Sequence, residues 1–373
     1  MNFARRQFLQ LAGAAATATA LPQLASAQPK TQVKMADFVF PKSTWENASP
    51  SEAGWSPQKL EEARQFFQAL PASSMIVVDR GRVIVEWGDP AKRIKLSSVR
   101  KSILSALYGN DVRAGRIDLN ATIEQLGLDD DPPLTGEERH ATLRMLLQSR
   151  SGVYHSFVGG TPDMRANKPL PGSHPPGTFW HYNNWDFNAL GTVFEKQSNK
   201  KIGEAFRDEI AAPTQMQDFR LEDMYYVRAT DKSEDFEKSI HPAYQFRLTA
   251  RDMARLGYLF LQGGDWNGTQ VIPNSWVSES TRSYSDAGNG FGYGYLWWVN
   301  GFNLPFNSFS AWGALGKCIV VVPERALVVA FANHTEFPDT YQAMPESEVK
   351  RLPNVSRLEM GRLLNMLLVA QRP

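Results

Sequence analysis

The pattern of apolar and polar positions predicts a β-hairpin early in the chain. Branched and other apolar residues fill Met75–Val78 and Val83–Trp87, and the polar stretch Asp79-Arg80-Gly81-Arg82 separates the two runs. A glycine turn between two such runs is typical of paired strands. Similar β-rich runs return late in the chain, at residues 292–299, 317–322 and 326–332. Both ends of the chain are therefore expected to supply strands.

Three other segments carry apolar residues at helical spacing, namely residues 98–109, 249–262 and about 354–370. Ser97 or Ser98 is placed to cap the first helix, and Gly109 is expected to end it. Gly263-Gly264 is expected to end the second helix. The first of these helices directly follows the predicted hairpin.

The segment between the two groups of strands reads differently. Residues 110–245 mix short amphipathic stretches with long Pro- and Gly-rich loops, which indicates a mostly helical insertion. We therefore predict an α/β fold of the α+β kind, in which helices flank an antiparallel sheet. The sheet subdomain would comprise about residues 50–109 and 246–373, and the helical subdomain about residues 110–245.

Composition and charge narrow the possible functions. Of the 373 residues 42% are apolar and 21% charged, which excludes a disordered chain. With 40 basic and 39 acidic residues, the chain has no charge excess to attract nucleic acid, so a small-molecule partner is expected. The lone Cys318 excludes a disulfide framework and is predicted to lie buried in a strand. The six histidines form no zinc-protease motif, so neither metal nor cofactor is expected.

The first 27 residues are expected to be a removable signal. Arg5-Arg6 precedes Phe8-Leu9, an Ala-rich stretch and Ala25-Ser26-Ala27, which suits a cleavage site. This arrangement resembles a twin-arginine export signal. The alternative, a membrane anchor, is disfavoured because a permanent span needs about 20 strongly apolar residues. The mature protein would comprise residues 28–373, carry a net charge of −1, reside in the periplasm or outside the cell, and form no stable membrane association.

A serine is the best candidate for a nucleophile. No Gly-x-Ser-x-Gly elbow and no glycine-rich phosphate loop is present, whereas the spacing Ser-x-x-Lys occurs at Ser56/Lys59, Ser98/Lys101, Ser198/Lys201 and Ser347/Lys350. Of the four serines, Ser98 alone begins a strongly apolar helix after a predicted hairpin. Residues three apart lie on one helical face, so Ser98 and Lys101 are expected to touch.

That position suits nucleophilic chemistry. A serine hydroxyl needs a neighbouring base, and a lysine can be that base when burial and nearby positive potential keep it neutral. The start of a buried helix supplies both conditions, and its dipole favours negative charge on the serine oxygen. The alternative is a capping Ser98 with Lys101 extended along the surface.

Two further motifs follow in the chain. Tyr182-Asn183-Asn184 comes after a turn-rich approach and before a helix, where a tyrosine can move a proton, although packing on the core is the alternative. The similar Tyr108-Gly109-Asn110 is interpreted as a helix end. Small residues in Trp312-Gly313-Ala314 let the backbone approach a substrate, although a β-bulge is the alternative.

In this order the three motifs resemble the serine β-lactamase and penicillin-binding protein family, in its class C and esterase-like branch. The resemblance spans about residues 50–370 and implies a covalent acyl-enzyme. In it Ser98 attacks a carbonyl, Lys101 accepts the proton, Tyr182 protonates the leaving group and later helps to activate water, and Asn184 holds the substrate amide or Lys101. The backbone N–H groups of Ser98 and of Ala314, or alternatively of Leu315, would form the oxyanion hole.

One departure from the family bears on the substrate. Trp312-Gly313-Ala314 stands where lactamases have Lys-Thr-Gly, so a cation for a substrate carboxylate is missing, and alternation is expected to turn Lys317 away. The tryptophan resembles the family's carboxylesterases, and the following residues resemble its 6-aminohexanoate-dimer hydrolases. A cluster of aromatic residues is a candidate acyl pocket or a part of the core, namely Tyr293, Tyr295, Trp297, Trp298 and Trp312.

The leading hypothesis is an exported serine hydrolase that acts on a small ester or amide. A β-lactamase or D-alanyl-D-alanine peptidase is the second hypothesis, so a lactam stays among the expected substrates. A non-catalytic ligand-binding or sensor module of the same fold is the third. The complete set of Ser98, Lys101 and Tyr182 argues against the third, because a binding module needs no such set. The oligomeric state is not predicted.

Overall fold

A computed structural model describes residues 38–229, 238–337 and 344–371 of the chain. The expected export signal lies outside the described residues. Within the described residues, no helix combines the length and apolarity that crossing a membrane requires.

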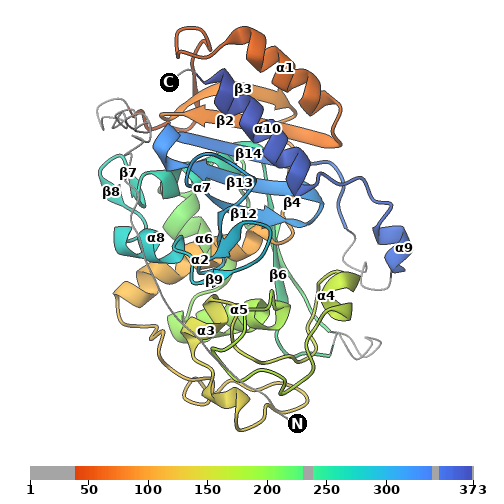
Figure 1. The fold of residues 1–373 in the computed structure, drawn as a ribbon. Helices are drawn as coiled ribbons and strands as arrows, with labels where there is room; N and C mark the ends of the chain where they lie inside the picture. Colours follow the sequence, from red (N-terminus) through yellow and green to blue (C-terminus); the bar gives the residue numbers. More distant parts are fainter. Residues whose placement is uncertain (1–37, 230–237, 338–343, 372–373) are drawn as a thin grey trace, which may run out of the picture. The chain divides into compact units, whose positions relative to one another are not determined.

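Both ends of the described chain contribute to one nine-stranded sheet (Figure 1). Its strand order is β1-β3-β2-β14-β13-β12-β11-β10-β9, and neighbouring strands are antiparallel except for β1 and β3. The strands are β1 (Glu46–Asn47), β2 (Ala72–Asp79), β3 (Arg82–Gly88), β9 (Ser285–Asp286), β10 (Phe291–Tyr293), β11 (Trp298–Asn300), β12 (Phe309–Gly313), β13 (Lys317–Val322) and β14 (Leu327–Asn333). The predicted antiparallel sheet is confirmed.

Two further sheets are smaller. One contains β4 (Ile94–Lys95), β6 (Ala243–Leu248) and β5 (Met224–Val227), and the other contains β7 (Asp265–Trp266) and β8 (Thr269–Gln270). The α-helices are α1 (Pro57–Gln68), α2 (Val99–Arg113), α3 (Leu143–Leu147), α4 (Pro162–Ala166), α5 (Asn184–Ser198), α6 (Ile202–Phe206), α7 (Ala250–Leu261), α8 (Asn274–Ser280), α9 (Glu346–Val349) and α10 (Arg357–Ala370). The segment 110–245 supplies α3 to α6 and long loops, and also strand β5 and the first residues of β6, which the predicted helical insertion did not include.

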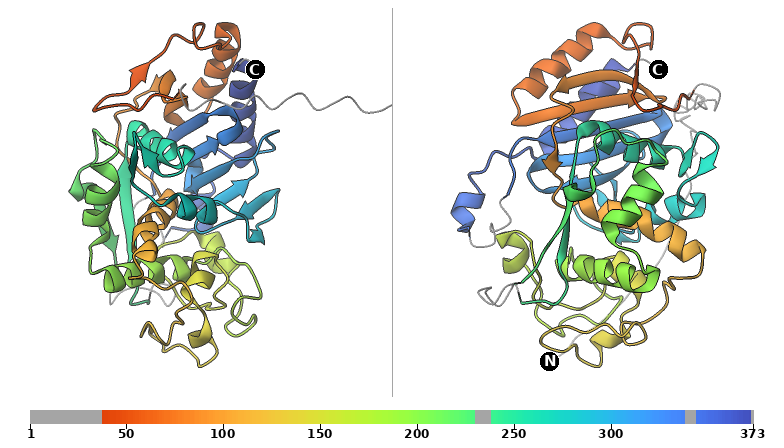
Figure 2. Two further views of the ribbon diagram at one scale, coloured as in Figure 1. Left: turned by 90° about the vertical axis from the view of Figure 1, so that its left-hand side faces the viewer. Right: turned by 180° about the vertical axis from the view of Figure 1, so that it is seen from behind.

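Helices cover both faces of the large sheet (Figure 2). Helix α7 packs on β13 and β14, where a Cβ at Gly257 would lie 2.6 Å from Val328, so glycine permits this close approach. Helices α1 and α10 pack together. The ring of Phe67 on α1 meets Phe331 on β14 edge to face. Because Val328 and Phe331 are three residues apart on one strand, they point to opposite faces.

Several predicted elements are confirmed with small shifts in their ends. The hairpin is β2 and β3, and Cys318 is fully buried on β13 as expected. Thr249 caps α7 by accepting a hydrogen bond from the N–H of Asp252 at 3.2 Å. The prediction of a single β-rich run at 292–299 is wrong. This segment folds back on itself as β10 and β11, with a turn between the two strands.

The predicted end of the helix at 98–109 is also wrong. Helix α2 continues past Gly109 to Arg113. A Cβ at position 109 would lie 2.7 Å from the ring of Trp276, so glycine permits α2 to pack closely against that ring. The small residue thus serves helix packing rather than helix termination. Since α2 ends at Arg113, Tyr108-Gly109-Asn110 is not a helix end. The Tyr108 hydroxyl donates a hydrogen bond to the Leu190 carbonyl at 2.7 Å.

Candidate active site

Ser98 stands at the start of α2, directly after the short strand β4. It occupies the N-cap position, but its hydroxyl makes no capping hydrogen bond to the helix backbone. Ser97 before it has a φ of 52°, in the left-handed region that residues with a side chain seldom adopt. Such strain persists where the surroundings fix the backbone, and here it turns the chain into α2 at Ser98.

Lys101 lies one helical turn along α2 and brings the predicted side chains together. Its Nζ lies 3.0 Å from Ser98 Oγ, 2.8 Å from the Tyr182 hydroxyl and 2.7 Å from Asn184 Oδ1. The side chain is 2% exposed, and the Phe187 ring packs against Nζ with its centroid at 4.2 Å. The sequence alternative, a surface lysine beside a capping serine, does not fit this arrangement.

Burial sets the charge of Lys101. Removal from water lowers the pKa of Lys101 well below its usual value, and the neighbouring Arg100 cation lowers it further. An uncharged amine has two N–H groups and one lone pair. It can donate to Asn184 and Tyr182 while it accepts the proton of the Ser98 hydroxyl.

Tyr182 is held by the loop that leads into α5. Asn183 caps this helix by accepting a hydrogen bond from the N–H of Trp185, and Asn184 is its first residue. Burial raises the pKa of Tyr182 to about 12, and the Ser98 hydroxyl and the cations of Arg100 and Arg357 oppose that rise. The phenol therefore stays protonated near neutral pH and can act as an acid.

Arg357 is a part of this surrounding that sequence reasoning missed. It is the first residue of α10, and its guanidinium carbon lies 4.1 Å from the centroid of the Trp298 ring. Trp298 in turn stacks on Tyr182, with ring centroids 5.3 Å apart. Arg357 lies 175 positions after Tyr182 in the sequence, and no motif links the two residues. They come together only because α10 packs on the sheet.

The third motif forms the end of β12 and the 3-10 turn Ala314–Gly316 before β13. A Cβ at Gly313 would lie 2.4 Å from the Leu96 carbonyl oxygen and 3.3 Å from the Ser98 nitrogen. The strand end thus runs directly against the backbone of Ser98. Leu315 has a φ of 67°, so a second strained residue lies beside the site.

The remaining candidates have mixed positions. Lys317 turns away from Ser98 and donates a hydrogen bond to the Thr335 carbonyl at 2.6 Å, as alternation predicted. Trp312 is half-buried and packs on Phe302. The other members of the aromatic cluster are buried in the core, namely Tyr293, Tyr295, Trp297 and Trp298. Of these, Tyr293 and Trp298 contact the Tyr182 ring.

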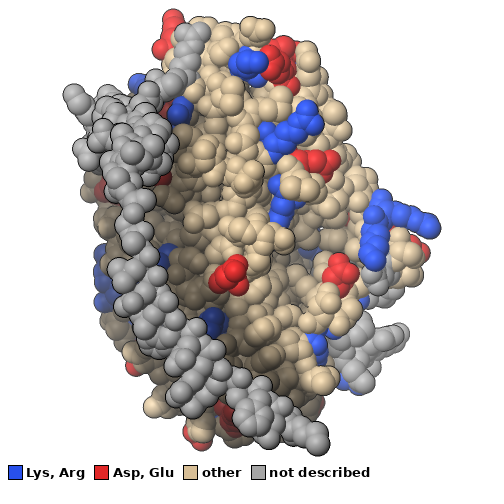
Figure 3. Space-filling model, in the orientation of Figure 1, with Lys and Arg blue, Asp and Glu red and all other residues tan. Residues whose placement is uncertain are grey.

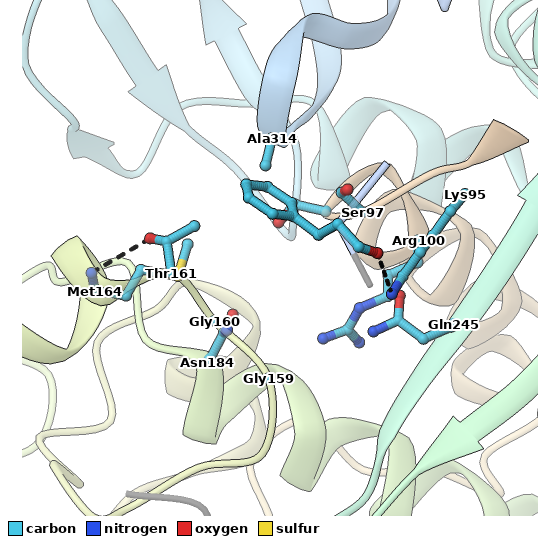
Figure 4. Close-up of a pocket in the computed structure, with 12 residues that line it drawn as sticks. Lys95, Ser97, Arg100, Gly159, Gly160, Thr161, Met164, Asn184, Gln245 and Ala314 are labelled. Atoms are coloured by element: carbon cyan, nitrogen blue, oxygen red, sulfur yellow. Dashed lines mark hydrogen bonds between the residues drawn. The ribbon is translucent and has the colours of Figure 1, made fainter. Parts of the chain in front are cut away.

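A pocket opens beside Ser98 (Figure 4). Its empty volume is about 430 Å³, including its mouth, and Ser98, Asn184 and Ala314 contribute to its lining. Tyr182, Trp312 and Gly313 do not line it. The aromatic cluster is therefore not a wall of this pocket.

The described residues offer neither a metal site nor a reactive thiol. Among them, no group of three or more His, Cys, Asp or Glu side chains is arranged to hold a metal ion. Burial raises the pKa of the Cys318 thiol, which disfavours a reactive thiolate there.

A family model of known proteins matches most of the chain. The profile of the family described as beta-lactamase matches residues 58–349. No curated protein sequence matches the chain significantly.

Solved structures with a similar fold include three with different descriptions. A candidate 6-aminohexanoate-dimer hydrolase from Bacillus anthracis superposes with a TM-score of 0.60 at 19% identity, covering 89% of each chain. A family VIII carboxylesterase gives a TM-score of 0.58 at 15% identity, covering 85% of this chain and 98% of the other. A class C beta-lactamase gives 0.57 at 12%, covering 85% and 96%. At these identities the likeness shows the fold.

Proposed function

The chain belongs to the beta-lactamase family, and we propose that it cleaves a small ester or amide through an acyl-enzyme on Ser98. One observation carries the proposal: Lys101 Nζ is within hydrogen-bond distance of Ser98 Oγ, the Tyr182 hydroxyl and Asn184 Oδ1. A nucleophile, a base and an acid that touch one another are what acyl transfer requires.

Acylation begins with attack of Ser98 Oγ on the substrate carbonyl. Neutral Lys101 takes the hydroxyl proton as the new C–O bond forms. The carbonyl oxygen becomes negative and is stabilised by the N–H groups of Ser98 and of Ala314, for which Leu315 is the alternative. The closeness of Gly313 to the Ser98 nitrogen supports this placement of the oxyanion hole.

Collapse of the tetrahedral intermediate breaks the bond to the leaving group. Tyr182 gives its proton to the departing oxygen or nitrogen and recovers it from the Lys101 ammonium, 2.8 Å away. Water then attacks the acyl carbonyl and gives one proton to the Tyr182 oxygen as Tyr182 passes its own proton to neutral Lys101. The bond between Ser98 Oγ and the acyl carbon breaks, the Lys101 ammonium returns the proton to Ser98 Oγ, and the acid product leaves. The Arg357 cation supports transient negative charge on Tyr182.

Trp312 favours esters and small amides over β-lactams as substrates. An aromatic side chain stands where a cation would pair with a β-lactam carboxylate, and Lys317 points elsewhere. On the face seen in Figure 3, Lys and Arg side chains are scattered among uncharged residues, which also suits a small substrate.

The test is a substrate panel of p-nitrophenyl esters, p-nitroanilides and a chromogenic cephalosporin. Ser98→Ala should lower kcat/KM for the esters by at least about 10³-fold. The matched control is Ser347→Ala, which alters an exposed serine from another Ser-x-x-Lys pair. Unchanged ester turnover in Ser98→Ala would overturn the proposal, and preferred turnover of the cephalosporin would make the protein a β-lactamase.

Export is a second part of the proposal. The twin arginines Arg5-Arg6 and the small residues before Gln28 support cleavage of residues 1–27 and release of the enzyme into the periplasm or the medium.

A further inference from the structure

The pocket beside Ser98 is lined by two cations that take no direct part in the proposed proton transfers. Among the described residues that line it, Lys95 and Arg100 are cationic and none is acidic. Neither cation belongs to the set that carries out acyl transfer. Figure 4 shows Arg100 and Gln245 side by side in this pocket, close to the end of Lys95.

Arg100 is buried with part of its hydrogen-bonding capacity unused. The residue is 3% exposed, its Nη2 donates to Asn188 Oδ1 at 3.1 Å, and its guanidinium packs on the Tyr244 ring at 4.3 Å. Its Nη1 has no hydrogen-bond partner among the described residues. A buried guanidinium in this state is costly, because an ionised group out of water needs a partner for each donor.

Gln245 on strand β6 adds a different polar group to the same pocket. The residue is 8% exposed, and its Oε1 has no hydrogen-bond partner among the described residues. Since Oε1 is an acceptor, it needs a donor from a ligand, whereas the Gln245 amide N–H groups can donate to one. The attraction for a negatively charged group therefore comes from the Arg100 guanidinium, and Gln245 can contribute hydrogen bonds beside it.

The wider surroundings are also positive. Lys95 Nζ donates to the Phe337 carbonyl at 3.3 Å. Burial lowers the pKa of Lys317 to about 8, Glu336 opposes this shift, and the Lys95 charge adds to it. The carboxylate of Glu336 pairs with Arg247 through Oε2 at 2.5 Å and accepts a hydrogen bond from the Lys95 backbone N–H. One described carboxylate therefore faces several cations, which favours an anion in the pocket.

We infer that the pocket binds a carboxylate carried on the acyl part of the substrate, with Arg100 as its principal partner. The acyl side is assigned because Ser98, Asn184 and Ala314 line the pocket whereas Tyr182, which would protonate the leaving group, does not. The preferred substrates are then half-esters or half-amides of dicarboxylic acids. This inference rests on the proposed function for its substrate class, but the pocket itself can be tested separately.

The kinetic test compares two matched substrates, the p-nitrophenyl half-ester of adipic acid and its methyl ester. The wild-type protein should show kcat/KM about 10-fold or more higher for the acid, since a hydrogen-bonded charge contributes about 1.5–3 kcal/mol. In Arg100→Met this ratio should fall to about 1, and in Arg100→Lys it should stay between the two. The ratio is the readout, because a general loss of activity next to Lys101 cancels in it.

The control for this comparison is Arg207→Met, which removes an arginine paired with Asp208 at the surface. Its ratio should equal that of the wild type. A wild-type ratio near 1, or a ratio unaffected by Arg100→Met in protein with a native thermal melt, would overturn the inference.

A binding test separates the pocket from the catalytic proposal. Monomethyl adipate should bind the Ser98→Ala protein in calorimetry, with a Kd at least about 10-fold lower than in the Ser98→Ala/Arg100→Met protein. This result would support the pocket even if p-nitrophenyl esters were not hydrolysed, in which case the proposed function alone would fail. Equal affinity for the two proteins would overturn the pocket and leave the role of Ser98 intact.

Discussion

Lys101 is the residue on which the proposed chemistry depends, because it contacts the other three predicted side chains at once. Its own contribution is a lone pair, which exists only while the amine is uncharged. Burial and the Arg100 cation lower the pKa of Lys101, so the neutral form persists at a pH where an exposed lysine would be charged.

The pH dependence of ester hydrolysis should report this lowered pKa. Protonation removes the lone pair, so kcat/KM should fall as pH drops through the pKa of Lys101, and the acidic limb should lie well below 10.5. Lys101→Met should lower kcat/KM by about 10²–10⁴-fold and abolish this limb. A profile that follows a pKa near 10.5 would show that Lys101 is charged in the resting enzyme.

Tyr182 should matter more for a poor leaving group than for a good one. Tyr182→Phe removes the acid but keeps the ring between Trp298 and Phe187. Turnover of alkyl esters and amides should fall about 10²-fold or more, while p-nitrophenyl esters, whose leaving group needs no proton, should lose much less. An equal loss for both kinds of substrate would argue that Tyr182 positions Lys101 instead.

Individual residues were predictable from sequence where a motif fixes local geometry. Ser98 and Lys101 are one helical turn apart, so their contact follows from the spacing. The role of Tyr182 could be predicted only from the order of the three motifs along the chain. Arg357 gave no sequence signal, because it reaches the site through tertiary packing. Arg100 belongs to no motif that the sequence analysis singles out, and its unpartnered Nη1 becomes evident only from the burial of its side chain against Tyr244.

At the scale of elements, the end of β12 and the start of α2 are fitted to each other at Gly313. A Cβ there would approach the Leu96 carbonyl to 2.4 Å, which is closer than real Cβ contacts. Since backbone atoms cannot rotate away, the strand or the helix start must move. The position of Ser98 therefore depends on the absence of a Cβ at Gly313 on β12.

Gly313→Ala is expected to damage both stability and activity. Overpacking of this kind costs about 1–3 kcal/mol, and kcat/KM for esters should fall at least about 10-fold because the Ser98 N–H is displaced. Chemical denaturation and ester kinetics measure the two effects. The control is Gly136→Ala, where a Cβ meets nothing within 4 Å. Native stability and activity in Gly313→Ala would contradict the close fit.

Elements were predictable where cap and turn chemistry is local. The hairpin β2–β3 and the Thr249 cap of α7 follow from short patterns. Gly109 was wrongly predicted to end α2, because glycine can either end a helix or permit close packing. The sequence alone does not distinguish these two roles, since the packing partner, Trp276, is distant in the chain. The run at 292–299 is apolar throughout, so periodicity did not reveal the turn between β10 and β11.

For the whole molecule, joining the two chain ends in one sheet was predictable, and the order of the strands was not. Strands at both ends of the chain imply a common sheet. That β2 pairs with β14 could not be predicted, because the two strands are far apart in the sequence and no local pattern specifies their pairing. Family membership was foreseen from three weak motifs in the right order. The substrate was not, because it depends on which side chains meet beside Ser98.

Export is a property of the whole chain and can be tested in cells. Replacing both Arg5 and Arg6 by Lys should leave the full-length precursor in the cytoplasm, because the twin-arginine signal is read by its receptor. Fractionation and the mass of the N-terminus measure the outcome, with a mature start at Gln28 expected for the unaltered protein. Arg64→Lys on α1 is the control. Equal amounts of processed protein outside the cytoplasm would refute the signal.

The acyl-enzyme on Ser98 is tested most directly by intact-mass analysis of acid-quenched protein during ester turnover, followed by peptide mapping. The expected result is a mass increase of one acyl group, located on Ser98 and absent from Ser98→Ala. An acyl group on another residue, or hydrolysis that continues in Ser98→Ala, would contradict the mechanism.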